Sequence, residues 1–311
     1  MSDARPRVAV VQAAPIAFET SHTIAKLEQL TLDAADQGAE LVVFPEAFVG
    51  GYPKGADFGA RVGLRRAEGR AWFSRYFDGA IELPGPELER LGRIAQEARV
   101  YLVAGVIERA GGTLYCTAIH LDRDGRYLGK HRKVMPTAME RLIWGFGDGS
   151  TLAAVESPWG RIGTAICWEN YMPALRLNLY SQQVAIYCAP TVDDREVWQA
   201  SMRHIAVEGR CFVLAAAQFT RRSDYPADYE CIQGDDPECI LIRGGSVIVD
   251  PFGEVLAGPV YGEETILFAE LDLSRIAQGK YDLDVSGHYA RPDIFSLAVN
   301  RSPQDPVRSS D

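Results

Sequence analysis

Three side chains in the sequence could together carry out nucleophilic chemistry, because each stands where an apolar run ends. Cys167 closes the run RIGTAIC, just before a segment that begins at Pro173. Glu46 ends LVVFPE, where a charge is costly to bury without a purpose, and Lys133 ends the basic cluster KHRK. A carboxylate can take the thiol proton, and an ammonium can stabilise the anion formed on attack. The set therefore predicts catalysis by a cysteine nucleophile.

Each of these residues also has an ordinary structural interpretation. A free cysteine after a strand is most often a buried and inert thiol. A nucleophile must be reachable, and we expect a strand ending at Ile166 to leave Cys167 exposed at the sheet edge. Glu46 taken alone fits a loop carboxylate, and the cluster that ends at Lys133 fits a solvated face or an anion patch. The catalytic interpretation therefore requires that the three side chains meet in space.

Apolar runs alternate along the chain with segments whose apolar residues repeat at helical spacing. Helices are predicted over residues 21–37, after Pro84-Gly85-Pro86, near residues 173–183 and around residues 194–209. Strands are predicted at RVAVVQAA, AELVVFPE, RIGTAICW, VAIYCAP and CFVLAAAQF, and hairpins at VYLVAGVIE–LYCTAIHLD and GGSVIVDPFGEVLAGP. Residues 50–78 are interpreted as a loop that helps line or cover a pocket. Hairpins mixed with helical crossovers indicate an α/β or α+β sandwich.

Length and composition allow a large buried core. The chain has 311 residues, of which 47% are hydrophobic and 24% charged. No repeat or low-complexity linker divides it, so we expect a single domain over residues 1–295 and a polar C-terminal tail over residues 296–311. The formal net charge of −10, with acidic and basic residues interspersed, argues against nucleic acid as a partner.

The cysteines and histidines indicate the compartment and argue against a metal centre. None of the six cysteines forms a C-x-x-C pair, and the first residues, MSDARPR, lack the apolar core of a signal peptide. No run is long and apolar enough to cross a membrane. The five histidines show no metal-ligand spacing. We therefore expect a cytoplasmic protein with no membrane partner, no metal and no cofactor.

Several motifs together resemble one known family. FPE with Glu46, HRKVMPT with Lys133 and CWEN with Cys167, in this order, resemble the Glu-Lys-Cys signature of the nitrilase superfamily of carbon-nitrogen hydrolases. Other segments resemble true nitrilases and extend the likeness from near residue 8 to about residue 295: ERLIWGFGDGS, CAPT, HIAVEGRCFVLAA, GGSVIVDPFGEVLAGP and GHYARPD. PTAMERLIWG is most similar to plant-type nitrilases and their bacterial relatives. Tyr171 departs from that pattern, because plant-type enzymes commonly carry Arg there, and this departure bears on specificity.

The resemblance implies a fold, an assembly and roles for the site residues. It implies an α-β-β-α sandwich that pairs into an αββα-αββα homodimer, and often into larger spiral homo-oligomers. Glu46 would act as general base, Lys133 would stabilise the tetrahedral intermediate and Cys167 would attack. Glu140 matches the family's second active-site glutamate, although it also fits a helix N-terminal carboxylate or a partner of Arg141.

The implied activity is hydrolysis of a nitrile to a carboxylic acid and ammonia, through a thioimidate and a thioester on Cys167. Aliphatic or arylaliphatic nitriles, or β-cyanoalanine, would be the small-molecule substrate. We place Trp144, Trp168 and Tyr171 nearest the nucleophile as substrate-binding residues, and expect the Trp168 N–H to serve as an oxyanion donor. Two alternatives remain open at this point: an amidase or carbamoylase of the same superfamily, and a catalytically silent scaffold.

Overall fold

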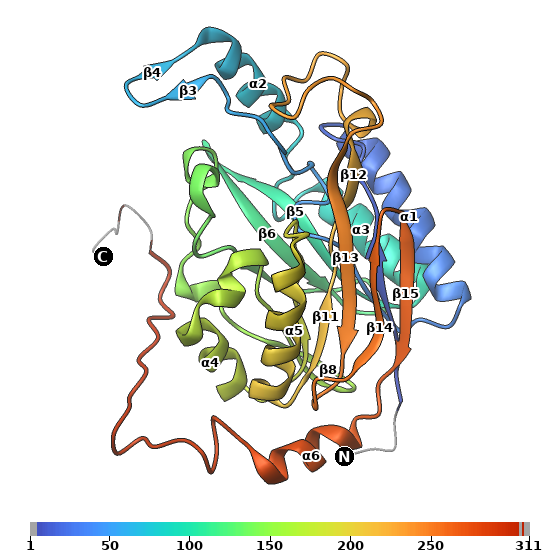
Figure 1. Ribbon diagram of the computed structural model, residues 1–311, viewed down its shortest axis with the longest axis vertical. Helices are drawn as coiled ribbons and strands as arrows, with labels where there is room; N and C mark the ends of the chain where they lie inside the picture. Colours follow the sequence, from blue (N-terminus) through green and yellow to red (C-terminus); the bar gives the residue numbers. More distant parts are fainter. Residues whose placement is uncertain (1–4, 305–306, 308–311) are drawn as a thin grey trace.

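Two β-sheets lie face to face at the centre of the structure, and helices cover their outer faces (Figure 1). The computed structural model describes residues 5–304 and 307. The first sheet has six strands, in the spatial order β15 (Thr265–Glu270), β1 (Arg7–Gln12), β2 (Leu41–Val43), β5 (Tyr101–Ala110), β6 (Thr113–Leu121) and β7 (Tyr127–Arg132). Strands β1, β2 and β5 are parallel, while β15, β6 and β7 pair antiparallel with their neighbours.

The second sheet contains the strand that leads to the predicted nucleophile. Its order is β12 (Phe219–Arg221), β13 (Ile240–Val249), β11 (Phe212–Ala215), β10 (Val184–Cys188), β9 (Gly160–Thr164) and β8 (Val155–Ser157), with β14 (Val255–Tyr261) paired to β13. The helices are α1 (Thr20–Asp36), α2 (Ala67–Asp78), α3 (Pro86–Ala98), α4 (Pro173–Ser181), α5 (Glu196–Gly209) and α6 (Ser274–Asp282). Short 3₁₀ helices span Ala138–Leu142 (η1), Gly149–Thr151 (η2), Cys167–Tyr171 (η3) and Arg222–Asp224 (η4).

Alternate residues of the strands pack into different layers of the core. Val8 of β1 belongs to the same buried cluster as Ile186 of β10, between the sheets. Ala9, which points to the opposite face, belongs to a cluster with Leu27 of α1 and with residues of α3. On the outer face of the second sheet, Val213 joins a cluster with residues of α4 and α5. The central strands β2, β10 and β11 are covered on both faces and are therefore continuously apolar, and the layers form the predicted α-β-β-α sandwich.

Three predicted helices, α1, α4 and α5, are confirmed to within two residues at each end, and α3 begins at Pro86 as expected, but one predicted loop is wrong. The segment over residues 50–78 contains the strand pair β3 (Ala60–Arg61) and β4 (Leu64–Arg65), and the whole of α2. Helix α2 is held by aromatic contacts with distant segments: Trp72 lies edge-on to Tyr229 at 5.5 Å, and Tyr76 edge-on to Phe18 at 5.5 Å. Such contacts between separated segments leave no local pattern in the sequence, since tertiary packing supplies most helix stability.

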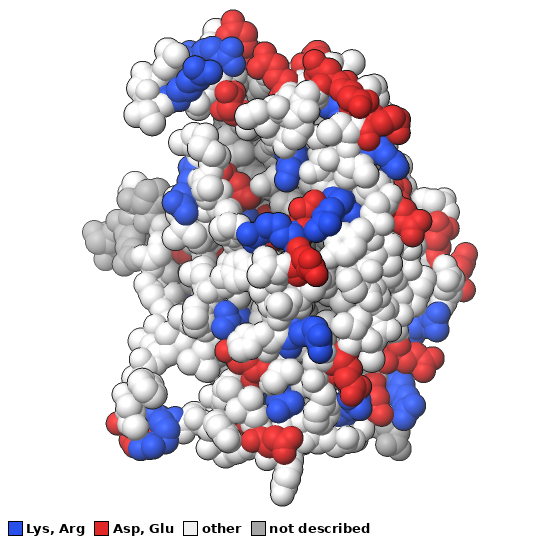
Figure 2. All heavy atoms as spheres, in the orientation of Figure 1, with Lys and Arg blue, Asp and Glu red and all other residues white. Residues whose placement is uncertain are grey.

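The surface and the C-terminal segment bear on the remaining expectations. Figure 2 shows acidic and basic residues interspersed on the visible face of the molecule. No helix within the described residues is both long and apolar enough to cross a bilayer.

After α6, residues 283–304 contain turns but no helix or strand, and they run along one edge of the molecule (Figure 1). The predicted tail falls partly on residues 305, 306 and 308–311, which lie outside the described part, and the boundary at residue 295 stays a prediction.

Candidate active site

Strand ends from both sheets deliver the predicted catalytic side chains to one point. Glu46 follows β2 and Lys133 follows β7 directly, both in the first sheet, whereas Cys167 lies just beyond β9 in the second sheet. Gly105 of β5 allows the turn after β2 to pass close by, because a Cβ at this position would lie 2.1 Å from the Pro45 carbonyl oxygen. The site therefore forms where the two sheets face each other.

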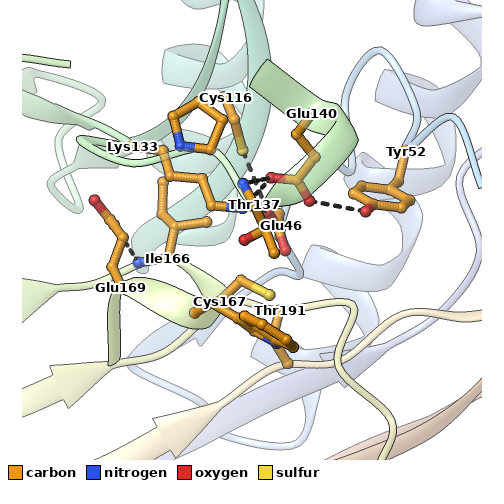
Figure 3. A network of polar contacts seen from close by, with 12 residues as sticks. Glu46, Tyr52, Cys116, Lys133, Thr137, Glu140, Ile166, Cys167, Glu169 and Thr191 are labelled. Atoms are coloured by element: carbon orange, nitrogen blue, oxygen red, sulfur yellow. Dashed lines mark hydrogen bonds and ion pairs between the residues drawn. The ribbon is translucent and has the colours of Figure 1, made fainter. Parts of the chain in front are cut away.

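Lys133 is the centre of a buried ionic cluster. Its Nζ donates to Glu46 Oε1 at 2.6 Å and to Glu140 Oε2 at 2.8 Å. The side chains of Lys133 and Glu46 are fully buried, and that of Glu140 is 9% exposed. Figure 3 shows the three groups together on one side of Cys167. The structure thus brings together the four residues for which the sequence predicted a catalytic role.

Cys167 begins η3 in a strained backbone conformation. Its φ is +52°, which side chains with a Cβ rarely adopt and which is often found at functional sites. The expected exposed position at the sheet edge is wrong: β9 ends at Thr164, and Cys167 is only 3% exposed. Its N–H donates to the Pro190 carbonyl at 2.9 Å and so cannot serve an oxyanion. The Trp168 N–H lies in the first turn of η3, where N–H groups have no intrahelical partner, so its use as an oxyanion donor stays a prediction.

Burial and neighbouring charges shift the proton affinities of the cluster. Burial raises the pKa of the Cys167 thiol, and the Glu46 carboxylate raises it further, so the resting side chain is a neutral thiol that needs a base. Burial also raises the pKa of Glu46, against the opposing effect of Lys133. For Lys133, burial alone would lower the pKa, but Glu46, Cys167 and Glu140 raise it well above its usual value. Lys133 therefore stays an ammonium at neutral pH.

Glu140 has a hydrogen-bond donor on each carboxylate oxygen. Its Oε2 accepts from Lys133 and, at 2.6 Å, from the Thr137 N–H at the start of η1. Its Oε1 accepts from the Tyr52 hydroxyl at 2.8 Å. Glu140 is thus both a helix N-terminal carboxylate and part of the cluster, and the Arg141 Nε instead donates to Pro136 O at 3.1 Å. Both oxygens of the Glu140 carboxylate are therefore occupied by donors.

Glu46 has fewer hydrogen-bond partners. Its Oε1 accepts from Lys133 and is 3.6 Å from the Cys116 sulfur. Its Oε2 is buried and has no hydrogen-bond partner within residues 5–304 and 307 that meets ordinary geometry. Although burial dominates the pKa of Glu46, the Cys167 thiol is near enough to lower it. Of the two carboxylates, Glu46 is therefore the one with an oxygen free to receive a proton.

The three aromatic residues predicted to bind substrate lie in two different environments. Trp144 is buried; the Lys133 Nζ lies 5.5 Å from its ring centroid, and its Nε1 donates to the Tyr76 hydroxyl at 3.2 Å. Trp168 is 43% exposed and Tyr171 39% exposed, with ring centroids 5.9 Å apart. Trp144 therefore belongs to the wall behind Lys133, whereas Trp168 and Tyr171 reach the surface beside the nucleophile.

Three further residues of the site were not singled out from the sequence. Tyr52 bonds to Glu140 as described, and the Thr191 hydroxyl is near enough to the Cys167 thiol to lower its pKa, against the larger effect of burial. Glu169 follows the nucleophile by two positions and is buried. Glu169 and Thr191 fall within the motifs CWEN and CAPT, which were the available signal, but only the fold reveals their partners.

A cavity of about 280 Å³ opens beyond Glu140. Its lining is Tyr52, Pro53, Lys54, Gly55, Ala56, Asp57, Phe58, Met139, Glu140, Leu142, Ile143 and Gln233. The first seven of these residues belong to the segment over residues 50–78 that was predicted to line or cover a pocket. Within the described residues, no group of three or more His, Cys, Asp or Glu side chains is arranged to hold a metal ion.

Comparison with known proteins places the chain in a family. Residues 7–281 match the carbon-nitrogen hydrolase family. The chain is 56% identical to the "Bifunctional nitrilase/nitrile hydratase NIT4A" of Lupinus angustifolius, over 97% of this chain and 88% of that protein. It is also 56% identical to the "Aliphatic nitrilase" of Sinorhizobium fredii (strain HH103), over 97% of both. The C. elegans NitFhit structure shares the fold, with a TM-score of 0.76 and 21% identity over 98% of this chain and 70% of that one. The chain therefore belongs to the carbon-nitrogen hydrolase family, which is the nitrilase superfamily.

Proposed function

We propose that the protein is a nitrilase that converts a nitrile to a carboxylic acid and ammonia. The observation that carries the proposal is the buried cluster in which Glu46, Lys133 and Glu140 lie beside the strained Cys167. The names of relatives 56% identical to the chain support a nitrile rather than an amide as the substrate.

The first half of the reaction attaches the substrate to the enzyme. Glu46 takes the proton of Cys167, and the sulfur adds to the nitrile carbon while one C–N π bond breaks. The nitrogen receives the proton back from Glu46, which leaves a thioimidate. Lys133 and the Trp168 N–H stabilise the negative charge that develops during the addition.

The second half consumes two molecules of water. Glu46 deprotonates the first, which adds to the thioimidate carbon and gives a tetrahedral intermediate with hydroxyl, amino and thioether substituents. Protonation of its nitrogen expels ammonia and leaves a thioester, which the second water cleaves to the acid and the free thiol. Glu140, whose oxygens are occupied by donors, holds Lys133 in place throughout.

The same intermediate offers a second product. If the nitrogen is not protonated, its lone pair can expel the Cys167 thiolate and release an amide after uptake of a single water. The name of the Lupinus relative, a bifunctional nitrilase and nitrile hydratase, supports this branch as a second outcome here.

The exposed aromatic pair, Trp168 and Tyr171, supports substrates with an apolar chain or ring, so we propose aliphatic or arylaliphatic nitriles, with β-cyanoalanine as a further candidate. The name "Aliphatic nitrilase" for the Sinorhizobium relative supports the first class. We also propose a homodimer or larger homo-oligomer in the cytoplasm, where six free thiols would persist.

A panel of nitriles tests the proposed activity. The purified protein should release ammonia and the matching acid from at least one of an arylacetonitrile, an aliphatic dinitrile and β-cyanoalanine. Products should be quantified by chromatography together with ammonia, so that amide release is also seen. Hydrolysis of the matching amides alone would reassign the chain to the amidases, and inactivity on both classes would favour the scaffold interpretation.

The raised pKa of Glu46 predicts where activity is lost on the acid side. Glu46 must be ionised to accept the thiol proton, so kcat/KM should fall as the pH drops through its pKa. Because burial raises this pKa, the acid limb should lie above the ordinary range of a glutamate, about 4.3. A pH–rate profile between pH 4 and pH 8 checks this, and an acid limb at or below the ordinary value would contradict the assignment of Glu46 as base.

A further inference from the structure

A single buried carboxylate bonds to the backbone beside both Lys133 and Cys167. Glu169 Oε2 accepts the Ile166 N–H at 2.8 Å, and Oε1 accepts the Val134 N–H at 2.5 Å. Ile166 directly precedes Cys167, and Val134 directly follows Lys133. The Glu169 side chain is fully buried, so water does not compete for these bonds.

These bonds connect two parts of the site that no strand ladder connects. Lys133 continues β7 of the first sheet, and Cys167 follows β9 of the second. Packed apolar side chains fill the space between the sheets, and such contacts lack the directionality of hydrogen bonds. The hydrogen bonds that cross near Cys167, between Thr164 and His120 and at Glu169, therefore constrain the relative position of the two sheets more sharply. In Figure 3, Glu169 lies beside Ile166, below the Lys133 segment.

A third bond to Glu169 comes from His131, which lies on β7 of the first sheet. Its Nε2 lies 2.8 Å from Glu169 Oε2, and its Nδ1 lies 3.3 Å from the Thr151 carbonyl oxygen. Burial alone would lower the pKa of His131, but Glu169 raises it above its usual value. An imidazolium in this position offsets the cost of burying the Glu169 charge, and it binds the carboxylate to β7, the strand that Lys133 directly follows.

We infer that Glu169 is a positioning residue that holds the nucleophile turn in register with Lys133 across the two sheets. The strained conformation of Cys167 persists only if its surroundings hold it. The Cys167 backbone itself bonds to Pro190 and to the Asn170 amide, and the Ile166 N–H bond to Glu169 fixes the residue directly before it. A displacement of about 1 Å can cost about 10²-fold in rate. The expected loss of turnover rests on the proposed function, whereas the expected loss of Cys167 thiol reactivity does not.

The test is Glu169→Gln, read out by alkylation of Cys167 with iodoacetamide. A glutamine offers one acceptor oxygen where three donors converge, so it keeps the shape but must lose bonds. The second-order rate constant at Cys167, mapped by mass spectrometry of its peptide, should fall about tenfold or more, and kcat about 10²-fold with KM within about threefold. Alkylation requires no nitrile turnover.

Asp250→Asn is the matched control. Asp250 is also buried, its Oδ1 accepts the Phe252 and Glu254 N–H groups at 2.9 Å each, and its other oxygen pairs with Arg275. It lies in the turn between β13 and β14 and bonds to none of the catalytic residues named above. This variant should lower the melting temperature while leaving the alkylation of Cys167 unchanged.

The outcomes separate the inference from the proposed function. If the folded Glu169→Gln protein alkylates and turns over like the wild type, the inference is wrong. If that variant does not fold, two variants of His131 replace it in the test. His131→Leu should slow the alkylation of Cys167, and His131→Gln, whose amide can still reach Glu169, should restore the rate. Equal alkylation rates for the two variants would overturn the inference. Rapid labelling of the wild type without hydrolysis of any nitrile would instead reject the proposed function alone.

Discussion

The Cys167→Ala variant is expected to release no ammonia above background from any nitrile that the wild type hydrolyses. Its sulfur forms the covalent bond of both intermediates, so no other side chain can replace it. The fold should survive. Alanine also has a Cβ, so the backbone strain at φ +52° is unchanged. The loss of one small buried group lowers the free energy of unfolding by about 1 kcal/mol. Circular dichroism and a thermal melt check the fold, and ammonia release checks the activity.

Cys188→Ala is the control for this variant. Cys188 is likewise a fully buried thiol whose pKa is raised by burial, but it lies in β10 within the cluster between the sheets. Its loss should cost similar stability and leave the activity intact. Ammonia release by Cys167→Ala at a rate near that of Cys188→Ala would exclude Cys167 as the nucleophile.

Lys133→Gln is expected to lower kcat/KM by about 10²–10³-fold or more, the usual cost of removing one group that stabilises developing charge. The first effect is the loss of the positive charge itself. The structure adds a second effect, because Glu46 and Glu140 share the Lys133 ammonium in a buried site. Without it, two carboxylates face each other, and one of them must keep a proton. If Glu46 keeps that proton, the base is lost together with the cation.

The stability of Lys133→Gln should depend on pH with a defined sign. The folded-state pKa of Glu46 is already raised by burial and should rise further without Lys133. A group whose pKa is raised on folding contributes its stability at low pH, and this contribution is lost as the pH rises through the folded-state pKa. The melting temperature of the variant, relative to the wild type, should therefore fall more at pH 8 than at pH 5.

Lys130→Gln is a suitable comparison for this measurement. Lys130 pairs with the buried Glu108, but Glu108 would keep its bonds to Arg132 and so would not be left unpaired. Its deficit in melting temperature should change little between the two pH values. An equal pH dependence for both variants would show that Lys133 is not the ammonium that balances the two carboxylates.

The sequence alone determined the elements of the fold and the chemical types at the site. Apolar spacing predicted α1, α4 and α5 to within two residues, because a helix or strand that buries one face must repeat with a fixed period. The order of Glu46, Lys133 and Cys167 in their motifs supported the family. Each of these signals is contained in a short stretch of the chain and can therefore be seen without the fold.

Only the tertiary structure decided how these parts meet. Residues 67–78 form α2 because aromatic side chains from other segments pack against them. Cys167 is buried because the second sheet is covered by the first at the point where β9 ends. Tyr52 acquires a role through Glu140, and Glu169 through Val134, each across a long separation in the chain. Contacts of this kind leave no periodic trace in a single sequence, since they depend on which distant segments the fold brings together.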